Sequence, residues 1–244
     1  MQPINSRQNE RFKSLLELKK DKGLLMLEGR RLVLDALSRG YEPIHSAVTP
    51  AYIELHGMPQ FDFIFLSEDL FSKLSDTQTP QGIIVFIRRP FKSLDELKHH
   101  DRLVILDGLQ DPGNVGTIIR SAEAFGFGGI IITPGTASPY SEKAVRASMG
   151  SVLGIDIALA GAGEIASLDH IIVSLVPDGG EPVRHEMFTG RFALCLGQEG
   201  SGLSADILTL PGIKTYIPMK GGTESLNVAV AAGIVMAIAA GIAV

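Results

Sequence analysis

Residues 103–129, LVILDGLQDPGNVGTIIRSAEAFGFGG, decide the fold, because a short apolar run leads through a Pro-Gly turn into an amphipathic stretch. Residues 103–106 predict a buried strand, and residues 115–125 predict the helix that follows it. Similar apolar runs recur at residues 129–133, 152–158, 170–175, 192–196 and 215–217, with a further helix predicted over 141–147. Strands that are apolar throughout and alternate with helices predict an α/β fold with a mostly parallel sheet covered on both faces.

The N-terminal part of the chain, residues 1–89, predicts a smaller α/β domain of its own. Apolar residues at helical spacing cover 9–20 and 29–39, and strand-like runs lie at 24–27, 44–48, 61–66 and 83–87. The charged stretch RRPFKSLDELKHHD, residues 88–101, contains an early proline, so residues 90–101 predict a linker or a short exposed helix. Residues 102–244 then form the larger domain.

The composition excludes several classes of protein. The chain has 244 residues, 45% of them hydrophobic and 20% charged, which excludes wholesale disorder, collagen and coiled coil. The single cysteine, Cys195, excludes a disulfide-stapled secreted scaffold. Residues 1–11 carry no apolar signal-peptide run, so we expect a cytoplasmic location. The net charge is −5, but residues 1–50 hold 9 Lys and Arg against 6 Asp and Glu, which is compatible with an RNA contact without being evidence for one.

The last part of the chain, residues 225–244 (SLNVAVAAGIVMAIAAGIAV), contains no charged side chain. About twenty apolar residues can span a membrane, so a tail anchor is an alternative. Against it, alanine, glycine and valine predominate, and the segment has no basic flank and no aromatic belt. We favour a helix buried against the sheet or against another subunit.

Three loops follow predicted strands, at the sheet edge where open α/β folds bind ligands. In the first, Asn114 is the predicted N-cap of the helix that starts at residue 115, and Arg120 lies nearly two turns further on. Taken alone, these two residues are read as a cap and a surface arginine. A dinucleotide-binding loop is a weaker alternative, because GNVG lacks the GxGxxG spacing.

The second loop, LGQEGSGLS at residues 196–204, surrounds Glu199 with glycines that allow a ligand to approach the backbone closely. The third, IPMKGGTESLNVAVAAGI at residues 217–234, predicts Ser225 as the cap of the final helix. Asn227 stands at the mouth of that helix, where a buried amide requires hydrogen-bonding partners. Each loop alone is more often a tight turn than a site.

Taken together, the three patterns are more specific. NxGxxxRxA from Asn114, GxEGxGL from Gly197 and IPMxGxxxSLNVAVAAGI from Ile217 resemble the three motifs of the SpoU/TrmH family, in the SPOUT superfamily. Residues 138–151, SPYSEKAVRASMGS, match the connecting segment of the family, so the resemblance covers residues 103–240. LLMLEGRRLVLDAL and PQGIIVFI in the N-terminal domain resemble the L30e-like substrate-binding domain that many members carry.

The resemblance implies an RNA ribose 2'-O-methyltransferase that uses S-adenosylmethionine, with a trefoil-knotted α/β catalytic domain. It also implies a homodimer whose active-site residues gather near the subunit contact, and, given the added N-terminal domain, 23S ribosomal RNA as the substrate. The implied cofactor-binding residues are Leu196, Gly197, Glu199, Gly200, Ile217, Met219, Ser225 and Leu226. The implied catalytic residues are Asn114, Arg120, Glu199, Ser225 and Asn227.

The chemistry suggests a role for each catalytic residue. Arg120 is expected to hold the target phosphate and stabilise developing alkoxide charge, because a guanidinium with a pKa above about 12 is a poor base. Asn114 would orient the ribose or Arg120, while Ser225 and Asn227 would fix the pocket. Glu199 either contacts substrate or only organises its loop. Methyl transfer from a sulfonium needs no metal, and the six scattered histidines predict no metal site.

Two alternatives keep the same fold. A transfer-RNA methyltransferase is the closer one, although enzymes of that type typically carry short terminal helices instead of an L30e-like domain. A non-catalytic RNA-binding or antibiotic-protection protein is the other, and the intact motif residues argue against it.

Overall fold

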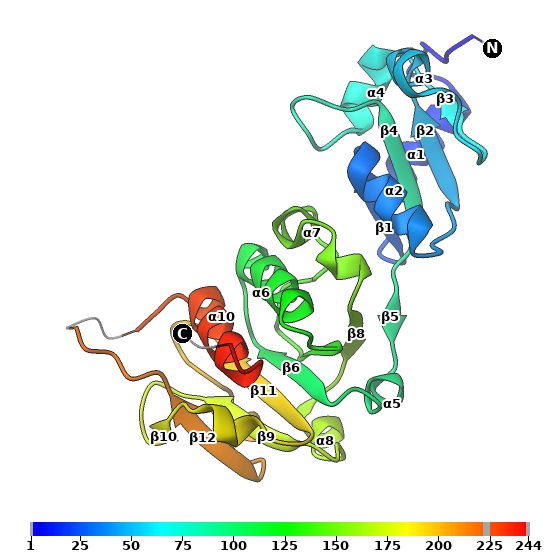
Figure 1. Ribbon diagram of the computed structural model, residues 1–244. Helices are drawn as coiled ribbons and strands as arrows, with labels where there is room; N and C mark the ends of the chain where they lie inside the picture. Colours follow the sequence, from blue (N-terminus) through cyan, green and yellow to red (C-terminus); the bar gives the residue numbers. More distant parts are fainter. Residues whose placement is uncertain (1, 222–224, 243–244) are drawn as a thin grey trace. The chain divides into compact units, whose positions relative to one another are not determined.

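The computed structural model describes residues 2–221 and 225–242. The chain forms two compact units, Met1–Arg89 and Pro90–Val244. The first contains a four-stranded sheet in the order β1-β4-β2-β3, in which β4 pairs antiparallel with β1 and β2, and β3 pairs parallel with β2 (Figure 1). Its elements are α1 (Glu10–Leu18), β1 (Leu24–Glu28), α2 (Arg30–Ser38), β2 (His45–Val48), α3 (Pro50–His56), β3 (Ile64–Phe65), α4 (Glu68–Leu74) and β4 (Ile83–Arg88).

The core of the first unit lies between the sheet and helices α1 and α4. Phe12 and Leu15 of α1 pack with Phe71 of α4 and Phe86 of β4, all of them buried. Asn9 caps α1 by accepting the Arg11 N–H, so the predicted helix begins one residue later than its pattern suggests. The expected strand over 61–66 is shorter, Ile64–Phe65.

The second unit contains an eight-stranded sheet in the order β10-β12-β9-β11-β6-β7-β8-β5, with every strand pair parallel. Its strands are β5 (Phe91–Lys92), β6 (Arg102–Asp107), β7 (Gly129–Ile132), β8 (Asp156–Leu159), β9 (Ile171–Leu175), β10 (Glu181–Pro182), β11 (Phe192–Gly197) and β12 (Gly212–Tyr216). Its helices are α5 (Leu94–Leu97), α6 (Pro112–Ala124), α7 (Glu142–Ser148), α8 (Ala162–Ile165), α9 (Ala205–Leu208) and α10 (Val228–Ala239), with 3₁₀ turns at Ser151–Leu153 and His185–Phe188. The predicted α/β class and mostly parallel sheet are confirmed.

Helices cover both faces of this sheet. Leu97, Ile165 and Ile207, from α5, α8 and α9, pack on one face against alternate residues of the central strands, among them Leu103 and Ile105. On the other face, α6 contacts α7 and α10 (Figure 1). The strands are apolar throughout because both of their faces are covered.

Three sequence predictions in this unit need correction in detail. Of the two alternatives for residues 90–101, the short helix forms, as α5 with Ser93 in a capping box; β5 pairs with β8, so the segment is part of the second unit and not a linker. Residues 152–158 are not one strand, because a 3₁₀ turn covers Ser151–Leu153 and β8 starts only at Asp156. The strand predicted at 215–217 instead covers Gly212–Tyr216.

The final helix, α10, is buried as favoured from the sequence. It has 12 residues and packs on α6 and β11 (Figure 1). Within the described part of the chain, no helix has the length and apolar character needed to cross a membrane. After β11 the chain adds β12 beyond β9, and α10 then packs beside α6.

Candidate active site

The site lies where the central strands end. Gly197, the last residue of β11, is in register with Asp107, the last residue of β6, so the loops after both strands start side by side. α6 follows the first of these loops, and α10 packs beside α6. The three motifs therefore meet at the carboxyl edge of the sheet, as the parallel topology predicts.

Asn114 does not cap α6, contrary to the prediction. Asp111 is the N-cap: its side chain accepts the Gly113 N–H at 2.8 Å, and Pro112 occupies the first helical turn, which it favours. Lys143 donates to the same carboxylate at 2.6 Å. Two hydrogen bonds lower the pKa of Asp111 below its ordinary value: the one from Lys143 has the larger effect, and the one from the Gly113 N–H the smaller. Because Asp111 takes the capping role, the Asn114 side chain is available to reach another loop.

Ser225 does not cap the final helix either. Asn227 does, because its Oδ1 accepts the N–H groups of Ala229 and Val230 at 3.0 and 3.3 Å. Asn227 is exposed rather than buried. Its amide nonetheless has the partners expected of it, as its Nδ2 donates to Glu199 and Asn114.

Asn114, Glu199 and Asn227 form one cluster, called here the three-loop cluster because each belongs to a different one of the three loops singled out in the sequence, although Asn114 itself lies in the first turn of α6. Glu199 Oε1 accepts Asn114 Nδ2 at 2.9 Å and Asn227 Nδ2 at 2.8 Å. Asn227 Nδ2 also donates to Asn114 Oδ1 at 3.2 Å. The Val228 N–H, at the start of α10, approaches the same Glu199 oxygen at 3.4 Å. A single carboxylate oxygen thus joins all three motifs.

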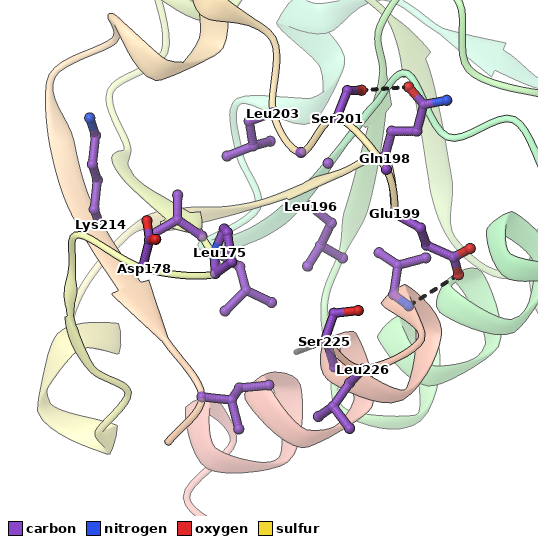
Figure 2. A pocket seen from close by; sticks show the side chains of 18 of the residues that line it. Leu175, Asp178, Leu196, Gln198, Glu199, Ser201, Leu203, Lys214, Ser225 and Leu226 are labelled. Atoms are coloured by element: carbon purple, nitrogen blue, oxygen red, sulfur yellow. Dashed lines mark hydrogen bonds between the residues drawn. The ribbon is translucent and has the colours of Figure 1, made fainter. Parts of the chain in front are cut away.

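A cavity of about 520 Å³ lies beside this cluster, within the usual size range for a small-molecule site. All eight residues predicted to bind the cofactor line it: Leu196, Gly197, Glu199, Gly200, Ile217, Met219, Ser225 and Leu226. Figure 2 shows Leu196 and Ser225 near the middle of the cavity and Leu226 below them, with Glu199 on one side and Asp178 and Lys214 on the other.

A second, smaller hollow of about 270 Å³ shares a wall with this cavity. Asn114 and Asp111 line the hollow but not the cavity, and the shared wall consists of Gln198, Glu199, Gly200 and Val228. The site therefore offers two adjoining compartments, with Glu199 between them.

Arg120 lies apart from the cluster. It is exposed on α6, its side chain makes no hydrogen bond or ion pair with the residues that the structure describes, and it lines neither compartment. Six residues separate it from Asn114, which puts the two side chains on different faces of the helix. Within one chain, the structure does not bring Arg120 together with the other predicted catalytic residues.

The structure adds residues that the sequence did not single out. Asp107 is buried, and its two oxygens accept Thr133 Oγ1 at 2.8 Å and the Ser204 N–H at 2.6 Å, which ties the loop after β11 to the end of β6. Residues 175–179 after β9 line the far side of the cavity. Both could have been suspected, because each follows a predicted strand at the same sheet edge as the motifs.

Comparison with known proteins identifies the family. The SpoU rRNA methylase family matches residues 101–237, and an MRM3-like substrate-binding domain matches residues 9–85. The chain belongs to the SpoU rRNA methylase family. The resemblance found in the motifs is confirmed, and with it the enzyme class, an S-adenosylmethionine-dependent RNA methyltransferase.

Relatives within this family match almost the whole chain. The 23S rRNA (guanosine(2553)-2'-O)-methyltransferase RlmP of Bacillus subtilis is 31% identical, over 97% of this chain and 98% of the relative. The AdoMet-bound rRNA methyltransferase from Sinorhizobium meliloti has a TM-score of 0.81 and 28% identity, covering 97% of this chain and 96% of that one. The SpoU methyltransferase AviRb from Streptomyces viridochromogenes, in complex with AdoMet, has a TM-score of 0.80 and 27% identity, covering 95% and 98%.

Proposed function

We propose that this SpoU-family enzyme transfers the methyl group of S-adenosylmethionine to a ribose 2'-hydroxyl in 23S ribosomal RNA. The observation that carries the proposal is the pair of adjoining compartments at the carboxyl edge of the sheet. In-line transfer needs the sulfonium on one side and the acceptor oxygen on the other, held in contact. The larger compartment suits the donor, and the smaller, with Asn114 in its wall, suits the target ribose.

The bonds in this step are simple to follow. The bond between the donor sulfur and the methyl carbon breaks as the bond between the ribose oxygen and that carbon forms. The donor leaves as the neutral thioether, and the hydroxyl proton passes to water. The protein's contribution is alignment and stabilisation of charge on the ribose oxygen.

Glu199 organises the site rather than accepting the proton. Its Oε1 is already engaged by Asn114, Asn227 and the Val228 N–H, so it fixes Asn114, which lines the ribose compartment, and the amide of Asn227 beside it. A glutamine retains one acceptor oxygen at this position. Glu199→Gln should therefore keep turnover within about tenfold of wild type, whereas Glu199→Ala should lose much more. Equal, complete loss in both variants would favour a role for the charge in proton transfer.

Arg120 acts from the second subunit of a homodimer. Three observations support this. Arg120 is exposed, and it lies apart from the three-loop cluster of its own chain. On the neighbouring apolar helix α10, Val230 is 53% exposed, which leaves an apolar side chain for a second subunit to cover. In this arrangement Arg120 holds the target phosphate and stabilises the alkoxide. Arg120→Lys, which removes the planar fork, should lower turnover at saturating RNA; near-wild-type turnover would contradict this role.

Subunit mixing tests the shared site. Arg120→Ala and Asn114→Ala homodimers should each bind the donor normally in calorimetry and lack methylation. After exchange of subunits, half of the dimers are mixed and one of the two sites in each is intact, so activity should recover to about a quarter of wild type. No recovery in demonstrably mixed dimers would place both residues in one chain, and loss of donor binding in both variants would contradict their assignment to the acceptor side.

The first unit is proposed to bind the RNA. It matches a substrate-binding domain, and it has a hollow of about 550 Å³ lined by Arg30, Arg31, Tyr52, His56 and Gln81 among others. A cationic hollow suits the phosphate backbone, and ribosomal RNA as substrate supports a cytoplasmic location.

The substrate is tested by labelling RNA from cells that lack this protein. The purified enzyme and tritiated donor should label 23S ribosomal RNA, and mapping should locate a single 2'-O-methylated ribose. Label in transfer RNA alone would favour the tRNA alternative. Absence of label from every RNA pool would favour a non-catalytic protein of the same fold.

A further inference from the structure

His99, His100 and Asp156 come together at the opposite edge of the large sheet from the donor cavity. His99 and His100 precede β6, and Asp156 is the first residue of β8, so the group lies at the amino ends of parallel strands. Each side chain offers one ligand atom, and these three atoms lie within 4.8 Å of one another. Two imidazoles and one carboxylate form a ligand set that binds divalent transition metals.

The spacing between two of these ligands already suits a metal ion. His100 Nε2 and Asp156 Oδ2 are 2.9 Å apart. Two ligand atoms bound at about 2.0–2.2 Å are about 2.8–3.1 Å apart at a right angle and about 3.3–3.6 Å apart at the tetrahedral angle, so the observed pair lies at the narrow end of this range. An ion could therefore insert between His100 and Asp156 with little movement of either.

The fold holds two of the three ligands in place. The His100 ring lies against Gly128, where a Cβ atom would fall 2.2 Å from His100 Nδ1, so only glycine leaves room for the ring. The His100 carbonyl contacts His170 Nε2 at 2.8 Å. Asp156 is in register with Gly129 on the neighbouring strand. His100 therefore presents Nε2, and not Nδ1, toward Asp156.

The third ligand needs only a side-chain rotation. His99 is exposed, and its ring lies 3.8 Å from that of His100 between centroids. It makes no side-chain hydrogen bond with the described part of the chain.

We propose that His99, His100 and Asp156 bind one Zn²⁺ or similar divalent transition-metal ion, with water completing the shell. The ion would fasten the connection between α5 and β6 to the start of β8. It lies away from the donor cavity and takes no part in methyl transfer, so the expectation of metal-free chemistry is unaffected. The proposal does depart from the prediction that the six histidines form no metal site, because the fold brings His99 and His100 next to Asp156. The proposal does not depend on the proposed function. The competing explanation is a plain His100–Asp156 ion pair.

Metal titration of the untagged full chain distinguishes the two. After treatment with a chelator, wild type should take up one Zn²⁺ per chain in competition with a chromophoric chelator, and its melting temperature should rise. Co²⁺ should give visible absorption bands of a site with nitrogen and oxygen ligands. His99→Gln and Asp156→Asn should bind more than about tenfold more weakly. His45→Gln, which removes an exposed histidine of β2, should bind as wild type does.

His99→Gln is the decisive variant. Because His99 makes only a ring contact, its replacement should leave the metal-free melting temperature unchanged and abolish the rise with Zn²⁺. Zn²⁺ binding of equal strength in wild type and His99→Gln would overturn the three-ligand site. So would failure of wild type to bind Zn²⁺ at all, which would leave the His100–Asp156 ion pair.

Discussion

Gly197 allows the turn after β11 to close, and its replacement gives the sharpest test of how the donor cavity forms. A Cβ atom at this position would lie 2.3 Å from the Gly202 carbonyl carbon and 2.4 Å from the Leu203 nitrogen. Both neighbours are backbone atoms, so no side-chain rotation can relieve the overlap. The turn is also held by reciprocal hydrogen bonds between Gln198 and Gly202, at 3.0 and 2.8 Å. Gly197→Ala must therefore move the whole turn.

Overpacking of this kind costs about 1–3 kcal/mol, and the upper half of that range is expected here because the backbone cannot yield locally. Since the moved turn forms one wall of the cavity, affinity for S-adenosylmethionine should fall by at least about tenfold, equivalent to about 1.4 kcal/mol. Urea unfolding measures the first effect, and titration calorimetry measures the second.

Gly200→Ala is the matched control. Gly200 lies in the same turn, but a Cβ atom there meets nothing within 4 Å, so its free energy of unfolding should stay within about 0.5 kcal/mol of wild type. If Gly197→Ala were as stable as Gly200→Ala and bound the donor as wild type does, close approach of the two backbone segments would not be what forms this wall.

Three further variants test other parts of the molecule. Asp107→Asn should lower the free energy of unfolding by about 2 kcal/mol, because a buried carboxylate that accepts two hydrogen bonds loses its charge, and it should weaken donor binding measured by calorimetry. Replacement of Arg30 and Arg31 by alanine should weaken RNA binding and reduce its salt dependence by about one phosphate contact per arginine, leaving donor affinity unchanged. The lowered pKa of Asp111 means that its contribution to stability is present above the ordinary value of 3.8 and is lost as the pH falls through the folded-state value. Asp111→Asn, which keeps a cap but cannot titrate, should flatten the acid limb of a plot of melting temperature against pH.

Each of these variants has a control or a contrary outcome. Asp101→Asn removes an exposed carboxylate near Arg191 and should change the free energy of unfolding little. An equal loss of stability in Asp101→Asn and Asp107→Asn would mean that the buried hydrogen bonds of Asp107 contribute nothing beyond those of an exposed carboxylate. Lys20→Ala removes an exposed charge of the first unit, and RNA binding lost equally there would indicate general charge attraction. If the melting temperature of Asp111→Asn falls at acid pH as steeply as that of wild type, other carboxylates cause the fall.

Much of the fold could be predicted because its strands are buried on both faces. A continuous apolar run such as residues 103–106, followed by a turn and an amphipathic stretch, is compatible with few structures other than a buried strand leading into a helix. β5 escaped prediction because two residues carry no periodicity, and its pairing with β8 depends on contacts far away in the sequence. β10, at Glu181–Pro182, escaped for the same reason.

The errors at the helix caps have a common cause. Asp111 and Asn114 are both good N-caps, and so are Ser225 and Asn227, so composition alone cannot choose within each pair. At the start of α6, the Asp-Pro order decides, since proline favours the first helical turn. The sequence could therefore have identified Asp111 as the N-cap. With Asp111 in that role, the side chain of Asn114 is left to contact Glu199 in the cluster.

The three-loop cluster also explains why the motifs are needed for folding as well as for chemistry. Asn227 caps α10 with its oxygen and uses its nitrogen to bind Glu199, so one amide both starts the final helix and fixes the loop after β11. Asn114 makes the corresponding link from α6. The donor cavity and the acceptor compartment share the wall that these bonds hold, so a change at Glu199 should disturb both. Because Arg120 takes no part in these bonds, its loss should lower turnover without lowering the stability of the chain.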